Sequence, residues 1–167
     1  TVSRRTRYPR RDSMVTMQGD FTDIPEHLPE LVKRFEGGAD LVVAERSPAV
    51  LPTPARQLRR VAPWILRPFS GVPGVSDPFG SLRLYRIAIL RDLIKSMGDQ
   101  PIVDAEGWGA NVQLLVRAAA FARRIDTVSL DAHYDLRPRE SRVRPWNDAL
   151  GLFRTARALR ARGPATP

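Results

Sequence analysis

The residues of this sequence best suited to chemistry are charged side chains that follow short apolar runs. The first is Asp20 in the turn Gln18-Gly19-Asp20, where a carboxylate can hold a divalent cation that bridges two phosphates. Arg46 ends a second apolar run, and a guanidinium there can pair with a carboxylate or a diphosphate. Asp77 lies in a Gly/Pro-rich loop before a third run. Structural alternatives remain open: helix capping for Asp20, a solvated surface for Arg46 and turn formation for Asp77.

Two groups of basic residues could contact phosphates. Arg59 and Arg60 lie on a predicted amphipathic helix, where a solvated face is the simpler explanation. The densest basic cluster lies in a predicted loop over residues 135–145 and consists of Arg137, Arg139, Ser141, Arg142 and Arg144. Alternating arginines in a loop suit a phosphate group, but a solvated loop explains them equally well.

The apolar pattern predicts the elements that must position these residues. Strands are expected over 13–17, 39–44, 81–85 and 124–132, and helices over 25–36, 56–69, 86–97, 108–122 and 146–162. The first two strands are expected to be buried, Asp23 is expected to cap the first helix, and Gly37-Gly38 ends it. Strand, helix and strand over 13–44 have the length and order of a βαβ unit. We therefore predict an α/β fold with a mostly parallel sheet flanked by helices, and ligand binding at the carboxyl ends of its strands.

Composition limits the classes of function. The 167 residues are enough for one domain with a sizeable core. The sequence has no cysteine, which excludes disulfides, cysteine-ligated metals and thiol nucleophiles, and its two histidines make a histidine-rich metal site improbable. It contains no apolar run of membrane-spanning length and does not begin with the apolar core of a secretory signal. We therefore expect a cytoplasmic protein.

The net charge of +9 is concentrated in two segments. Residues 1–11 contain five arginines and no acid, and residues 137–162 contain eight arginines against two acids. Such segments suit nucleic acid, an anionic membrane surface or phosphorylated ligands. Because no aromatic residues are interleaved with the arginines, no nucleic-acid partner is expected. The helix over 146–162 is basic and amphipathic, so it either rests on a membrane face or packs on the domain.

The order of these motifs resembles the inverting family 2 glycosyltransferases of the GT-A (Rossmann-like) fold, and most closely their dolichyl- or polyprenyl-phosphate mannosyl- and glucosyltransferases. The resemblance covers residues 13–145. Five segments carry it in the expected order: Gln18-Gly19-Asp20, Gly37-Gly38-Ala39-Asp40-Leu41-Val42-Val43-Ala44-Glu45-Arg46, the basic helix that follows, Val75-Ser76-Asp77-Pro78-Phe79-Gly80-Ser81-Leu82-Arg83-Leu84-Tyr85-Arg86, and the cluster Tyr134–Arg142. Enzymes of this group transfer a sugar from a nucleotide-diphosphate donor to a polyprenyl phosphate.

The resemblance implies a role for each candidate residue. Asp20 and Gln18 correspond to the motif that binds Mg²⁺ or Mn²⁺, and Asp20 and Asp77 to the catalytic acids. Contacts to the donor diphosphate or the acceptor phosphate are implied for Arg46, Arg59, Arg60, Arg139, Ser141 and Arg142. It also implies a location at the inner face of the plasma membrane.

Two departures from the family pattern leave alternatives open. Gln18 replaces an acid, which weakens a site for a hard cation. The N-terminal nucleotide-binding half of such enzymes has no counterpart here, so residues 13–145 are expected to form the C-terminal part of a GT-A-like domain. Residues 1–12 are then a basic arm or a remnant, and residues 146–167 a basic helix and tail. The alternatives are a non-catalytic homologue and, with less support, a basic nucleic-acid-binding module.

Overall fold

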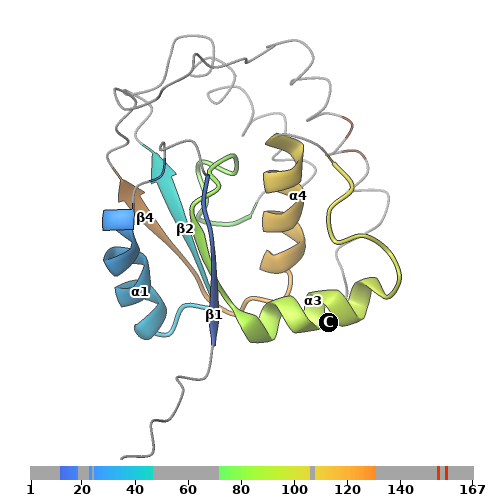
Figure 1. Ribbon diagram of the computed structural model, residues 1–167, viewed down its shortest axis with the longest axis horizontal. Coiled ribbons are helices and arrows are strands. Elements are labelled where there is room, and N and C mark those ends of the chain that lie inside the picture. Colours follow the sequence, from blue (N-terminus) through green and yellow to red (C-terminus); the bar gives the residue numbers. More distant parts are fainter. Residues whose placement is uncertain are drawn as a thin grey trace, which may run out of the picture.

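The computed structural model describes residues 12–18, 23, 25–46, 72–105 and 108–130, together with Arg154 and Arg157; for Arg46 and Trp108 it describes the backbone alone. Its elements are β1 (Ser13–Thr16), the 3-10 helix η1 (Pro25–His27), α1 (Leu28–Glu36), β2 (Leu41–Arg46), β3 (Arg83–Arg86), α3 (Ile87–Met97), α4 (Trp108–Ala119) and β4 (Ile125–Leu130) (Figure 1). The expected strands and helices within these ranges are all present, with ends shifted by a few residues. The helix expected over 56–69 lies outside the described residues, as does that over 146–162 except for Arg154 and Arg157, which are helical and exposed.

The four described strands form one mixed sheet in the order β1-β3-β2-β4. Strands β2 and β4 are parallel, whereas β3 is antiparallel to both of its neighbours, β1 and β2. The prediction of a mostly parallel sheet is therefore wrong. Strands β1 and β2 do run in the same direction, as a βαβ unit requires, but β3 is inserted between them. An apolar pattern reports how deeply a strand is buried and carries no information on its direction.

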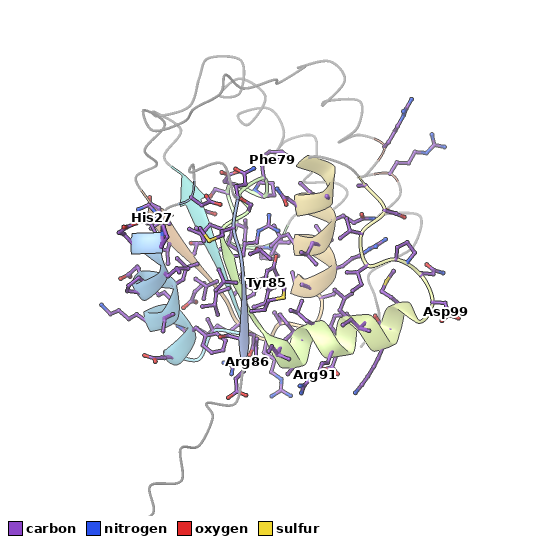
Figure 2. All side chains as sticks on the ribbon, viewed as in Figure 1. His27, Phe79, Tyr85, Arg86, Arg91 and Asp99 are labelled. Carbon is purple, nitrogen blue, oxygen red and sulfur yellow. The ribbon has the colours of Figure 1, made fainter. Side chains whose placement is uncertain are left out.

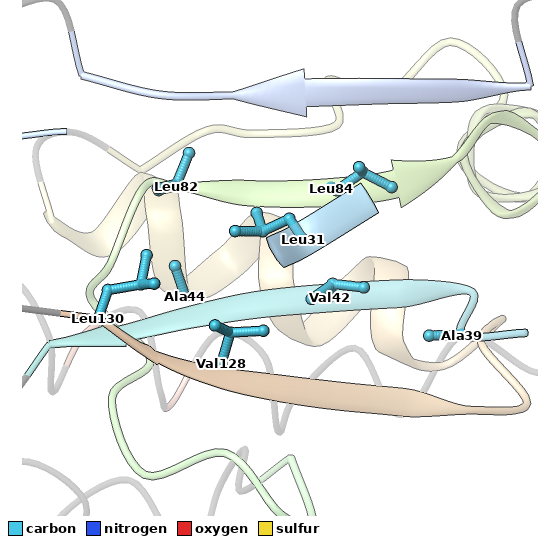
Figure 3. Packing of buried hydrophobic residues seen from close by; sticks show 8 residues of the cluster. All are labelled: Leu31, Ala39, Val42, Ala44, Leu82, Leu84, Val128 and Leu130. Atoms are coloured by element: carbon cyan, nitrogen blue, oxygen red, sulfur yellow. The ribbon is translucent and has the colours of Figure 1, made fainter. Parts of the chain in front are cut away.

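Helices cover both faces of the sheet, α1 on one side and α3 and α4 on the other (Figure 1). On the α1 side, Leu31 packs against alternate residues of β2, β3 and β4 (Figure 3), a cluster made of Leu31, Ala39, Val42, Ala44, Leu82, Leu84, Val128 and Leu130. On the other side, Leu41, Val43 and Tyr85 pack against residues of α3 and α4. Residues Leu41–Ala44 of β2 are thus buried on both faces, which explains why this part of the strand is apolar without interruption.

Strand β1 lies at an edge of the sheet and is largely exposed. Met14 and Val15 retain 39% and 38% of their accessible surface, although the sequence led us to expect a buried strand. The main contacts of α1 are with β2, β3 and β4, and those of α3 are with β3 and α4. Neither of these two helices packs mainly on β1, in agreement with its exposure. An apolar run of four or five residues cannot distinguish such an edge from a central strand.

The first helix starts differently from the expectation. Its N-cap is His27, which makes no side-chain capping bond, and Asp23 lies further back and is buried. At the other end Gly38 has a φ of +98°, a left-handed conformation that favours glycine. None of the helices in the described residues is long and apolar enough to cross a membrane.

Candidate functional site

The pairing of the strands brings several predicted site segments to one edge of the sheet. Arg83, the first residue of β3, pairs with Thr16 of β1 on one side and with Val43 of β2 on the other. Because β3 runs against its neighbours, the loop that precedes it meets the carboxyl ends of β1 and β2 (Figure 1). Gln18, Arg46 and the loop around Asp77 therefore share this edge, which we call the carboxyl edge. Adjacent strands are about 4.8 Å apart, so the ends of β1 and β2 are separated by about 10 Å.

The loop before β3, residues 76–80, is tied to the end of β2. The carboxylate oxygen Oε1 of Glu45 accepts hydrogen bonds from the backbone amides of Ser76 (2.5 Å) and Asp77 (3.4 Å). Asp77 is buried, and its Oδ1 accepts a hydrogen bond from the amide of Phe79 at 3.1 Å. This last bond is the turn-forming role that the sequence left open for Asp77. It holds the carboxylate at the carboxyl edge.

Gly80 allows this loop to approach β2 closely. A Cβ at Gly80 would lie 2.9 Å from the backbone oxygen of Ala44, a distance that real side chains essentially never show. Next to it, the amide of Ala44 donates a hydrogen bond to the backbone oxygen of Leu82 at 3.0 Å. A glycine is required here because of this close approach.

Asp23 connects the end of β1 to the start of β3. Its side chain, 4% exposed, accepts hydrogen bonds at Oδ2 from the amide of Gln18 and from Oγ of Ser81, both at 2.8 Å. Thr16 adds a third link, because its hydroxyl donates to the backbone oxygen of Ser81 at 2.7 Å. Analysis of the sequence missed this role and assigned Asp23 to helix capping. The partner that reveals this role is the hydroxyl of Ser81, which is 58 positions away in the sequence. No local sequence pattern connects two residues at that separation.

Polar side chains of α4 hold the segments next to the carboxyl edge. Asn111 donates from Nδ2 to the backbone oxygen of Phe79 at 3.3 Å, and Arg83 donates to the backbone oxygen of Asn111 at 2.6 Å. Further along α4, the buried Gln113 accepts hydrogen bonds from the amides of Asp104 and Ala105 at 2.9 and 3.0 Å and donates to Oδ1 of Asp104. The first turns of α4 are therefore fixed to two loops. These residues were also missed, because nothing in their spacing distinguishes them from a solvated helix face.

Most of the other candidates fall outside the described residues. These are Asp20, Arg59, Arg60, Arg139, Ser141 and Arg142, and also the side chain of Arg46. Their position along the chain is still informative for two of the segments. Asp20 follows β1 by four residues, and the cluster at 139–142 follows β4, which ends at Leu130 opposite Arg46. The strands that precede these segments, β1 and β4, both end at the carboxyl edge.

The donor set available for a cation is small. No three His, Cys, Asp or Glu side chains among the described residues are placed to hold a metal ion. Gln18 and Asp20 offer one amide oxygen and one carboxylate. Mg²⁺ is commonly held by one or two carboxylates together with substrate phosphates and water. Within the described part of the chain, there is thus no metal site built from these protein ligands alone.

The opposite end of the sheet carries an ion pair that serves the fold. Arg86 donates from Nε to Oδ1 of Asp40 at 2.7 Å, and its guanidinium lies 4.4 Å from the centre of the Phe35 ring. Burial raises the pKa of Asp40, but the hydrogen bond from Arg86, the backbones of Arg123 and Arg124 and the charge of Arg86 together lower it below 3.8. The carboxylate is thus charged and paired at neutral pH.

No family model matches this sequence, and no curated protein matches it either.

Proposed function

We propose that the chain is a glycosyltransferase-like protein with a partial GT-A architecture, which binds a nucleotide-diphosphate sugar at the carboxyl edge and transfers the sugar with inversion. The acceptor that fits best is a polyprenyl phosphate. The single observation that supports the proposal most is the convergence of Gln18, the end of β2 and the Asp77 loop on one edge of the sheet. These segments come from three separate parts of the sequence, and the resemblance assigns all three to one site.

Each group has a task that follows from its chemistry. Asp20 and Gln18 would hold a divalent cation at the diphosphate, where such a cation neutralises the charge on the leaving group. Arg46, Arg59 and Arg60 would contact the donor diphosphate, and Arg139, Ser141 and Arg142 would orient the acceptor phosphate. A phosphate monoester is already ionised at neutral pH, so its oxygen can attack the anomeric carbon without a strong base on the protein. Asp77 would shape the loop beside the reacting groups, through its bond to the amide of Phe79.

The basic C-terminal segment fits a lipid-linked acceptor. Arg154 and Arg157 are exposed and three residues apart, so they lie on one face of their helix. Such a face would rest on an anionic membrane surface, at the inner side of the plasma membrane, and bring the carboxyl edge to the acceptor.

Calorimetric titration of UDP and GDP into the purified chain, with and without Mn²⁺, tests the proposal. We expect one of the two nucleotides to bind in a metal-dependent manner. Asp20→Asn should weaken this binding about tenfold or more, which corresponds to the loss of a charged contact. Asp12→Asn is the matched control, because Asp12 is exposed and precedes β1 at the opposite end of the strand.

The outcomes separate the alternatives. If a nucleotide binds, assays with the matching nucleotide sugar and a polyprenyl phosphate should detect sugar transfer. If neither nucleotide binds with or without Mn²⁺, the transferase proposal is overturned. The non-catalytic homologue then becomes the better explanation, as the replacement of an acid by Gln18 suggests.

A further inference from the structure

We propose that Arg83 is a positioning residue, which fixes the loop of residues 76–80 at the carboxyl edge by joining it to α4. The statement that this loop serves a ligand rests on the proposed function. The statement that Arg83 holds the loop in place is independent of that function. Arg83 is the first residue of β3 and is 1% exposed. Its guanidinium donates from Nη2 to the backbone oxygen of Pro78 at 2.7 Å and from Nη1 to the backbone oxygen of Asn111 at 2.6 Å. One side chain thus joins the loop, the strand and the helix.

The free-energy cost of burying a guanidinium indicates that the hydrogen bonds of Arg83 are the reason for an arginine at this position. A guanidinium stays charged at any physiological pH, and its burial is costly unless it is paired. Arg83 forms no ion pair within the described part of the chain. Its buried Nε has no hydrogen-bond partner among the described residues, and its Nη1 also donates to the hydroxyl of Tyr85 at 3.3 Å. A leucine or methionine would fill the space at a lower cost in desolvation, but neither could bind two carbonyl oxygens.

The shape of the group explains the choice of arginine over lysine. Its planar fork presents N–H groups in fixed directions, so that two acceptors on separate elements can be bound at once. An ammonium group is compact and its donors rotate freely, so it specifies the relative position of two carbonyls poorly. Asn111 reinforces the connection from the other side, because its amide donates to the backbone oxygen of Phe79 in the same loop.

The chain provides a control on the same strand. Arg86 ends β3, and it is partly exposed and ion-paired to Asp40. In Figure 2 Phe79, from the loop, lies at one end of the sheet and Arg86 at the other, with Tyr85 between them. Replacement of Arg86 should therefore reduce stability without disturbing residues 76–80. A comparison of Arg83 with Arg86 separates a local effect on the loop from general loss of stability.

Hydrogen exchange of the full chain, measured by mass spectrometry, tests the proposal for Arg83→Met, Arg83→Lys and Arg86→Met. Both Arg83 variants should accelerate exchange of the amides in residues 76–80 by about tenfold or more, the ratio expected for loss of a hydrogen bond to a charged group. Arg86→Met should leave these amides within about twofold and accelerate exchange around residues 39–41 instead. If Arg83→Met does not fold, Arg83→Lys alone carries the comparison.

A titration of UDP and GDP with Mn²⁺ connects the loop to the proposed site. The Arg83→Lys variant should bind the nucleotide about tenfold more weakly than Arg86→Met at matched thermal stability. If neither Arg83 variant changes exchange in residues 76–80 relative to the Arg86 control, the role of Arg83 is refuted, whatever the nucleotides do. If exchange changes but the unmodified chain binds neither nucleotide, the role of Arg83 stands and the proposed function fails. If exchange changes and the Arg83→Lys variant binds the nucleotide normally, Arg83 positions the loop but not the site.

Discussion

The buried bond between Asp23 and Ser81 should be a measurable link between β1 and β3. The Asp23 carboxylate accepts from Oγ of Ser81 at 2.8 Å, and Ser81 is itself only 8% exposed. A hydrogen bond to a charged group contributes about 1.5–3 kcal/mol. Asp23→Ala should cost somewhat more than Ser81→Ala, because it also leaves the amide of Gln18 without the carboxylate that accepts its hydrogen bond at 2.8 Å.

A double-mutant cycle isolates the bond itself. Asp23→Ala, Ser81→Ala and the double variant are unfolded in urea, and the transition is followed by tryptophan fluorescence. The effects of the two single changes should fail to add by about 1.5–3 kcal/mol. Ser96→Ala supplies the matched control, since the Ser96 hydroxyl donates within its own helix to the backbone oxygen of Leu93. It should add to Asp23→Ala within about 0.5 kcal/mol. A coupling of the same small size for Ser81 would show that the two groups do not interact, and the reasoning would be refuted.

Three further changes have expected outcomes. Gly80→Ala places a Cβ against the backbone oxygen of Ala44, so it should lower the free energy of unfolding by about 1–3 kcal/mol; a urea midpoint equal to that of the unmodified chain would contradict the close approach. Because the pKa of Asp40 is lowered below 3.8, its contribution to stability is complete above that value and is lost as the pH falls through the folded-state pKa. Arg86→Met should therefore flatten the dependence of the melting temperature on pH below about pH 4, and an unchanged profile would remove Arg86 as a cause of the low pKa. Gln113→Leu removes the bonds to the amides of Asp104 and Ala105, so limited proteolysis should cut near residues 101–105 sooner than in the unmodified chain, and an unaltered cleavage pattern would show that the segment is held by other contacts.

Local patterns in the sequence identify the elements well. Apolar spacing locates α1, α3 and α4, and glycines mark the end of α1, because these signals act within one or two turns of helix. The strands are found for the same reason. The arrangement of the strands cannot be found in this way. The direction of β3 and the exposure of β1 depend on strand pairing between residues far apart in the sequence, such as Ser13 and Arg86.

The candidate site shows the same division. Asp20 and Asp77 were singled out because a carboxylate in a turn after or before a strand is a local signal, and Gln18 was singled out through the resemblance. Asp23, Arg83 and Asn111 were not found, although they connect the elements of the site, because the importance of each depends on a partner in another element. A buried charged residue is indistinguishable in sequence from an exposed one. The structure thus adds to the sequence the residues that hold the candidate site together.

The reversed direction of β3 is what brings the Asp77 loop to the site. Had β3 been parallel to its neighbours, its preceding loop would lie at the opposite edge, beside Asp40 and the start of β4. Because β3 is antiparallel to β1 and β2, Asp77, Phe79 and Gly80 lie near the carboxyl ends of those two strands. Arg83 lies where the loop enters the sheet. The feature that the sequence analysis got wrong is therefore also the one on which the proposed site depends. A strand β3 parallel to β1 and β2 would have left Gln18 and the Asp77 loop at opposite edges of the sheet.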